Sequence, residues 1–173
     1  MLSKNLPNPL KKKDKVSVLF VCLGNICRSP TAEGMFRDKV AASELGGAIH
    51  IDSAGTGDWH IGRPPDTRAQ HAARGRGYDI GDLRARQVSA ADFALFDYIL
   101  AMDAQNLQDL QVMRPANFTG HLGLMLQFDS SGAVTEVPDP YFGGEEGFQR
   151  VLDLLEAASQ GLLDHIRSQH FAR

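Results

Sequence analysis

The sequence predicts an α/β fold: an open, mostly parallel four-stranded sheet with helices on both faces. Short apolar runs, several rich in β-branched residues, alternate along the chain with longer stretches in which apolar residues recur every three or four positions. Such alternation is typical of parallel strands joined by crossover helices. The 173 residues are enough for one domain with a sizeable core, and no linker divides them.

The first strand and the first helix are predicted on either side of a short loop. Residues 16–21 are mostly apolar, which indicates a buried parallel strand. A helix should follow, with Ser29 as its N-cap, Pro30 at its first position and Glu33 placed to suit the helix dipole. Its apolar stripe consists of Ala32, Met35, Phe36 and Val40.

A second strand and a second helix come next. The glycine pair at 46–47 ends the connection into a strand at 49–51, which a right-handed crossover should place beside the first strand. Pro64-Pro65-Asp66 then opens a helix that ends by Gly75 and Gly77.

The second half of the chain completes the sheet. Ser89 and Asp92 predict a capping box before a short helix, and residues 97–102 predict the third strand. Asp103 should cap the following helix, and the segment 122–128 contains the fourth strand.

A long amphipathic helix is predicted to close the chain. Gly161 lies inside it, at an expected cost of about 1 kcal/mol. The apolar face of this helix consists of Phe148, Val151, Leu152, Leu155, Leu162 and Ile166.

The loop after the first strand predicts a site that attacks phosphate, because it sets Cys22 near one end and Arg28 near the other. Unpaired N–H groups and a positive helix dipole meet where a strand ends and a helix begins, and ligands of open sheets bind at that edge. A cysteine in such a field, beside an arginine, is expected to be a nucleophilic thiolate.

Arg28 offers a planar fork of donors to two phosphate oxygens. Gly24 and Asn25 tolerate a positive φ angle. The loop can therefore turn its N–H groups inward around a phosphate. The residues expected to form this cradle and its support are Leu23, Gly24, Asn25, Ile26, Cys27 and Ser29.

Two other interpretations of the loop find less support. It lacks the Gly-Lys-Ser/Thr ending of a nucleotide-binding P-loop, and no dinucleotide fingerprint follows a strand. Cys22 and Cys27 have nominal zinc-ligand spacing with His165 and His170, but the two pairs lie at opposite ends of the chain and Arg28 would repel a cation. The sequence therefore predicts neither a metal nor a cofactor.

The segment Val-Cys-Leu-Gly-Asn-Ile-Cys-Arg-Ser-Pro at 21–30 closely resembles the signature of the low-molecular-weight protein tyrosine phosphatases. The resemblance implies a flavodoxin-like domain of the phosphotyrosine phosphatase I type over 16–169. It also implies metal-independent hydrolysis of phosphotyrosine monoesters through a phosphocysteine on Cys22. Further matching stretches, in family order, are 52–56, 62–66, 85–87, 92–93, 96–103 and 137–141.

The same resemblance implies roles for individual side chains. Asp139, within Asp-Pro-Tyr, is implied as the general acid, and Ser29 as a hydrogen-bond donor to the thiolate. Asn25 is implied to fix the loop. Trp59 and Tyr141 are candidate walls for an aromatic substrate, with ordinary packing as the alternative role for Trp59.

Cys27 shares the loop with Cys22 and is the predicted redox partner: mild peroxide should give a Cys22–Cys27 disulfide that a dithiol reverses. The residues in and after this loop also bear on which related activity is expected. An arsenate reductase would need further cysteines downstream, and none follows Cys27. A protein-arginine phosphatase is the main alternative. The resemblance implies a threonine at the position of Ile26 in such enzymes, so the isoleucine here favours phosphotyrosine. A non-catalytic phosphate-binding module is less expected, since nucleophile, arginine and acid are all present.

The first fifteen residues carry five Lys and one Asp, and predict a flexible extension. Contact with an anionic membrane surface or an acidic partner is the alternative. Neither a signal-peptide core nor a bilayer-spanning apolar run is present, which predicts a cytoplasmic protein. The expected partners are phosphotyrosine-containing proteins, with no nucleic acid and no stable membrane insertion; the oligomeric state is not predicted.

Overall fold

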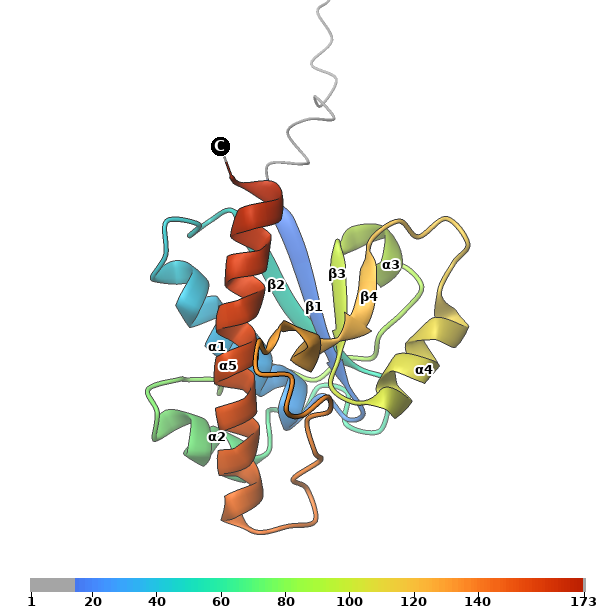
Figure 1. The fold of residues 1–173 in the computed structure, drawn as a ribbon. Helices are drawn as coiled ribbons and strands as arrows, with labels where there is room; N and C mark the ends of the chain where they lie inside the picture. Colours follow the sequence, from blue (N-terminus) through green and yellow to red (C-terminus); the bar gives the residue numbers. More distant parts are fainter. Residues whose placement is uncertain (1–14, 173) are drawn as a thin grey trace, which may run out of the picture.

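The computed structural model describes residues 15–172 and shows a four-stranded parallel sheet with helices on both faces (Figure 1). All three pairs of neighbouring strands are parallel. The predicted α/β fold is confirmed, and the sheet is wholly rather than mostly parallel. The strands, in the spatial order β2-β1-β3-β4, are β1 (Val16–Cys22), β2 (Ile49–Gly55), β3 (Tyr98–Ala101) and β4 (His121–Leu124).

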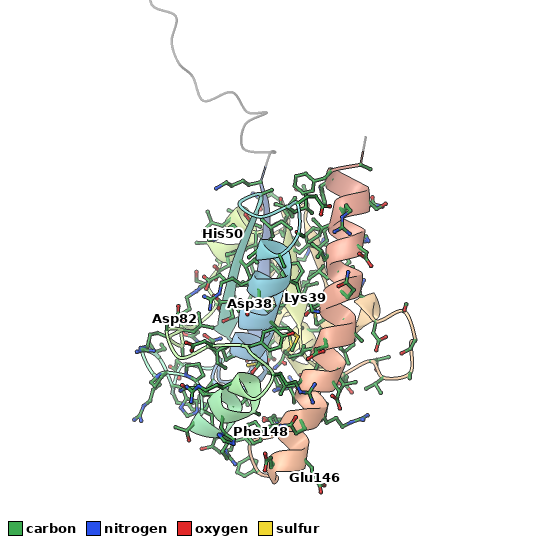
Figure 2. The ribbon with its side chains drawn as sticks, turned by 90° about the vertical axis from the view of Figure 1, so that its left-hand side faces the viewer. Asp38, Lys39, His50, Asp82, Glu146 and Phe148 are labelled. Carbon is green, nitrogen blue, oxygen red and sulfur yellow. The ribbon has the colours of Figure 1, made fainter. Side chains whose placement is uncertain are left out.

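Two helical layers cover the two faces. Seen from the side, α1, α2 and α5 form one layer, with Phe148 of α5 near α2 (Figure 2); α3 and α4 lie on the other face (Figure 1). The helices are α1 (Arg28–Ala41), α2 (Thr67–Arg74), α3 (Asp92–Leu95), α4 (Ala104–Met113) and α5 (Glu145–His170).

Strand β1 is apolar except for Ser17, because both of its faces are buried. Val18 and Phe20 belong to the core shared with α1 and α5, whereas Leu19 and Val21 belong to the core shared with α3 and α4. The chain leaves β1 toward β2 on one side and later returns to β3 on the other. Loops that diverge in this way open a crevice at the carboxyl ends of the strands.

The start of α1 differs from the prediction. The helix begins at Arg28 with Cys27 at the N-cap position, and no side chain caps it. Ser29 is therefore not the N-cap, because its hydroxyl is hydrogen-bonded to side chains of the preceding loop. No acidic residue lies in the first turn; Glu33 is buried against β2 instead, where it bonds Ser53. The predicted dipole role of Glu33 is wrong.

Two further details of the second half differ from expectation. The segment 122–128 is strand only as far as Leu124, and Met125–Phe128 forms a 3₁₀ helix, η2. A Cβ atom at Gly161 would overlap the backbone carbonyl of Phe128. Gly161 thus allows α5 to pack closely against η2. This contact explains why a residue of low helix propensity stands inside α5.

The capping box predicted at Ser89 and Asp92 forms only in part: Asp92 accepts from the backbone N–H of Ser89, but Ala91 stands at the N-cap position of α3 and no side chain caps that helix. The caps of α2 and α4 follow the sequence rules. Asp66 accepts a hydrogen bond from the N–H of Arg68 at the start of α2, and Asp103 accepts one from Asn106 at the start of α4. No helix within residues 15–172 has the length and apolarity needed to cross a bilayer. The Lys-rich extension predicted at 1–15 falls, except for Lys15, outside the described residues.

Candidate active site

A pocket of about 280 Å³ opens at the carboxyl end of β1. Three segments build it: the loop between β1 and α1, the loop after β2, and the segment before α5. It brings together residues that are distant in sequence. Its lining residues are Cys22, Leu23, Gly24, Ile26, Cys27, Arg28, Trp59, His60, Asp139, Tyr141 and Phe142.

The loop curls around the Cys22 sulfur. Asn25 has a φ angle of 56°, in the left-handed region, and its backbone N–H donates to Cys22 Sγ at 3.3 Å. At the end of β2, a Cβ on Gly55 would lie 2.7 Å from the carbonyl oxygen of Leu23. The absence of a side chain at Gly55 lets β2 support the loop at close range.

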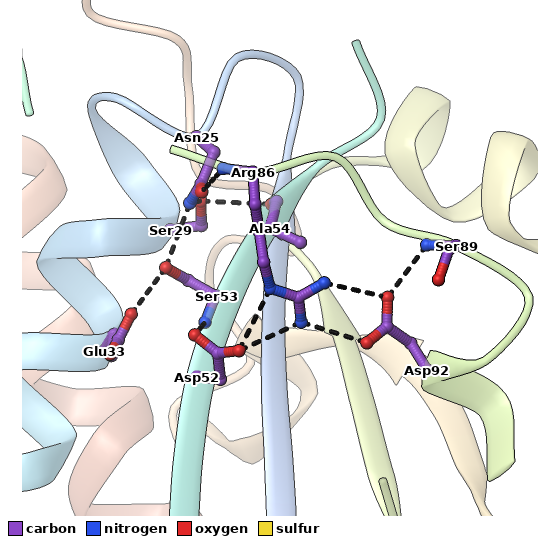
Figure 3. A network of polar contacts seen from close by, with 9 residues as sticks. All are labelled: Asn25, Ser29, Glu33, Asp52, Ser53, Ala54, Arg86, Ser89 and Asp92. Carbon is purple, nitrogen blue, oxygen red and sulfur yellow. Dashed lines mark hydrogen bonds and ion pairs between the residues drawn. The ribbon is translucent and has the colours of Figure 1, made fainter. Parts of the chain in front are cut away.

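The Asn25 side chain holds this conformation from below the loop. Its Nδ2 donates to Ser29 Oγ at 2.8 Å and to Ser53 Oγ at 3.0 Å, and its Oδ1 accepts from the N–H of Arg86 at 3.0 Å (Figure 3). Ser29 Oγ lies 3.0 Å from Cys22 Sγ. Because Ser29 accepts from Asn25, its own proton is available to the Cys22 sulfur.

Arg28 is fully buried at the first position of α1. Its Nη1 donates to Asp103 Oδ2 at 2.6 Å and to the carbonyl of Val137 at 2.9 Å. Burial acts to lower the pKa of Arg28, but the negative charges of Cys22, Asp103 and Asp139 together raise it. Arg28 is therefore a fixed cation beside the Cys22 sulfur.

Asp103 has a role that sequence reasoning missed, since the prediction gave it only the cap of α4. One carboxylate oxygen accepts from the N–H of Asn106, and the other binds Arg28. The available signal was its position just beyond Met102, which follows β3 at the carboxyl edge of the sheet.

Asp139 lies at the mouth of the pocket, with 41% of its side chain exposed. Its Oδ1 accepts from the backbone N–H of Tyr141 at 3.0 Å, and its Oδ2 lies 3.7 Å from Arg28 Nη2. The bond to Tyr141 thus holds one carboxylate oxygen, while the other lies toward Arg28.

Cys27 lines the same pocket as Cys22, and both are free thiols. Burial, followed by the charges of Asp66, Cys22 and Asp139, raises the pKa of Cys27 to about 12. Cys27 is thus a neutral thiol at physiological pH.

Aromatic and aliphatic side chains form the walls of the pocket. Trp59 is 61% exposed, so it is not a core residue, and Tyr141 faces the same opening. Sequence reasoning missed His60 and Phe142, which follow Trp59 and Tyr141 directly in the chain. Apolar walls above an anion cradle suit an aromatic phosphate ester.

The zinc alternative has no support among residues 15–172, which contain no group of three or more His, Cys, Asp or Glu side chains able to hold a metal ion. His165 and His170 pack around the Tyr98 ring. Cys22 and Cys27 lie instead at the pocket.

Comparisons with known proteins agree with this geometry. Residues 17–171 match the family model described as low molecular weight phosphotyrosine protein phosphatase. The low molecular weight protein-tyrosine-phosphatase YfkJ of Bacillus subtilis is 45% identical over 154 residues, which cover 89% of this chain and 97% of the relative. The Schizosaccharomyces pombe phosphatase is 42% identical, covering 87% and 97% of the two chains.

Solved structures give the same result. A protein tyrosine phosphatase from Entamoeba histolytica superposes with a TM-score of 0.85 at 41% identity, covering 89% of this chain and 98% of the other. A Drosophila arginine phosphatase gives a TM-score of 0.82 at 33% identity, covering 88% and 98%. The chain belongs to the low molecular weight phosphotyrosine protein phosphatase family.

Proposed function

We propose that Cys22 is the nucleophile, Arg28 the phosphate clamp and Asp139 the general acid of this protein tyrosine phosphatase. The observation that carries the proposal is the meeting of all three side chains in one pocket at the amino end of α1. A thiolate, a planar cation and a carboxyl group are the three components that cleavage of a phosphate monoester requires.

In the first step, the Cys22 thiolate attacks phosphorus in line with the tyrosine oxygen. The new S–P bond forms while the P–O bond to tyrosine breaks, and Asp139 gives its proton to the departing oxygen. The loop N–H groups and Arg28 hold the equatorial phosphate oxygens, where negative charge is spread in the transition state.

In the second step, water attacks the phosphocysteine. The Asp139 carboxylate takes a proton from this water, inorganic phosphate leaves, and the Cys22 thiolate is restored. Ser29 donates to the departing sulfur, 3.0 Å from its hydroxyl oxygen. Each turnover thus consumes one water and returns Asp139 to its protonated form.

The preferred substrate is phosphotyrosine in proteins. Leu23, Trp59 and Tyr141 line the opening and can contact both faces and the edge of a phenyl ring. A panel of peptides carrying phosphotyrosine, phosphoarginine or phosphoserine tests this choice. We expect the highest kcat/KM with phosphotyrosine; preference for phosphoarginine would favour the arginine phosphatase activity instead.

The catalytic domain extends over residues 16–169. Catalysis through a thiolate requires a reducing compartment, which supports a cytoplasmic location. The proposed partners are phosphotyrosine-containing proteins.

A further inference from the structure

Glu33 is a buried carboxyl group that the mechanism above does not use. It lies in the second turn of α1, only 8% exposed, and its Oε1 accepts a hydrogen bond from Ser53 Oγ at 2.6 Å. Buried carboxylates are rare because the charged form loses its hydration. This position therefore calls for an explanation in terms of what Glu33 contacts.

A continuous chain of hydrogen bonds links Glu33 to the nucleophile. From Glu33 it passes to Ser53 at 2.6 Å, to Asn25 at 3.0 Å, to Ser29 at 2.8 Å and to Cys22 at 3.0 Å. Figure 3 shows all but the last link, with Ser53 between Glu33 and Asn25.

The donors in this chain have a fixed order. Asn25 Oδ1 is occupied by the N–H of Arg86, so its Nδ2 is the group that donates to both serines. Each serine hydroxyl has a single proton. Ser53 therefore gives its proton to Glu33, and Ser29 is left with its proton for the Cys22 sulfur at 3.0 Å, the Ala54 carbonyl at 3.4 Å being the other acceptor within reach.

We propose that Glu33 is a positioning residue: its ionised carboxylate holds Ser53, and through it Asn25 and Ser29, in the donor order that serves the Cys22 thiolate. The proposal rests on the assignment of Cys22 as nucleophile. A protonated Glu33 is a weaker acceptor for the Ser53 proton than the carboxylate, and it can donate to Ser53 instead, which frees the Ser53 hydroxyl to turn away from its place beside Asn25. Asn25, with its left-handed φ angle, then loses part of the support for its strained conformation.

The charged groups around Glu33 set the pH at which this change occurs. Burial and the nearby carboxylates Asp52 of β2 and Asp82 raise the pKa of Glu33 to about 7, while the Ser53 hydrogen bond and Arg37 of α1 oppose this shift. Arg37 also forms an ion pair with Asp82, with 3.5 Å between Nη2 and Oδ1. Glu33 is thus ionised above about pH 7 and protonated below it.

The sign of the effect on stability follows from this raised pKa. In the unfolded chain the pKa of a glutamate is about 4.3, so ionised Glu33 destabilises the fold above pH 7. The destabilisation is relieved as the pH falls from 7 toward 4.3. Above about pH 7, ionised Glu33 should therefore improve catalysis and at the same time lower the stability of the fold.

The substitution Glu33→Gln separates these effects, because it keeps the shape and removes the charge. The activity of the parent divided by that of the variant should be near 1 below pH 6. It should rise to about fivefold above pH 8, with a midpoint near 7, because a hydrogen bond to a charged group is stronger than a neutral one. Titrations of the substrate and of other catalytic groups largely cancel in this ratio.

Thermal unfolding provides a second readout. At pH 8, Glu33→Gln should raise Tm by about 3 °C or more, and at pH 5 the two proteins should unfold at similar temperatures. A merely structural role for Glu33 predicts the opposite result: a lower Tm, with a ratio of activities that does not depend on pH.

Two further variants serve as controls. Asp38→Asn removes a carboxylate from the exposed side of the same helix (Figure 2). The activity of the parent divided by that of this variant should not change with pH. In a Ser53→Ala background, Glu33→Gln should change activity no further, because the link to Asn25 is already broken.

A flat ratio for Glu33→Gln, or the same pH-dependent loss in the Ser53→Ala background, would overturn the proposed role of Glu33. Neither result bears on the nucleophile. The assignment of Cys22 fails separately, if the Cys22→Ser variant retains turnover.

Discussion

Asp103 and Arg28 form the closest ion pair of the site, with 2.6 Å between Oδ2 and Nη1, and the same aspartate caps α4 through its other oxygen. One carboxylate thus connects Arg28 to the edge of the sheet beyond β3. Without this contact, Arg28 would keep the Val137 carbonyl and the more distant Asp139. The orientation of the guanidinium therefore depends on Asp103.

The first prediction concerns this pair. Asp103→Asn should lower kcat/KM by about 10- to 100-fold, because a charge-assisted hydrogen bond to a buried cation is lost. The helix cap should survive, since asparagine is as good an N-cap as aspartate. Steady-state kinetics and circular dichroism measure the two effects separately.

Glu136→Gln is the matched control. Glu136 accepts from the N–H of Ala104 at the same end of α4, and Arg28 is not among its hydrogen-bond partners. Its variant should keep nearly full activity. Equal losses in the two variants would mean that charge at this edge, rather than the contact with Arg28, supports catalysis.

The second prediction tests Asp139 through the leaving group. A general acid matters most when the departing oxygen is a poor leaving group, so Asp139→Asn should slow cleavage of phenyl phosphate by about 10²–10⁴. Nitrophenyl phosphate should be affected much less. The loop should be preserved, because an asparagine oxygen can still accept from Tyr141. Equal slowing of both substrates would show that Asp139 only shapes the loop.

The third prediction concerns oxidation. Peroxide should oxidise the Cys22 thiolate to a sulfenic acid, which Cys27 then attacks to form a disulfide with release of water. Since the Cys27 pKa is about 12, this second step should accelerate by about tenfold per pH unit in the physiological range. Mass spectrometry of quenched samples follows the disulfide.

Cys27→Ser is the companion variant for the oxidation experiment. After peroxide treatment this variant should lose activity irreversibly, whereas a dithiol should restore the activity of the parent. Equal recovery of both proteins, or the absence of a Cys22–Cys27 disulfide in the parent, would contradict the protective role of Cys27.

Local patterns in the sequence predict the elements well and the start of α1 poorly. The apolar run before Cys22 and the caps Asp66 and Asp103 depend on neighbouring residues, so propensity rules apply to them. The N-cap rule fails at Ser29 because Cys22 and Asn25 use its hydroxyl, a preference that no local rule contains.

Long-range contacts explain what the sequence does not reveal. Glu33 is buried because β2 brings Ser53 against it, and Gly161 is needed because η2 reaches α5. Asp139 lies beside Arg28 although more than a hundred residues separate the two in the sequence. Only the family resemblance, not periodicity or spacing, predicted that both belong to one site.

The most direct test of the account is a rapid-quench experiment on the parent and on Cys22→Ser with a phosphotyrosine peptide. Mass spectrometry should detect a phosphoryl group on Cys22 of the parent during turnover. Cys22→Ser should show no turnover yet still bind vanadate, because the N–H cradle and Arg28 remain. Substantial hydrolysis by Cys22→Ser, or phosphorylation of a different residue in the parent, would contradict the assignment of Cys22 as the nucleophile.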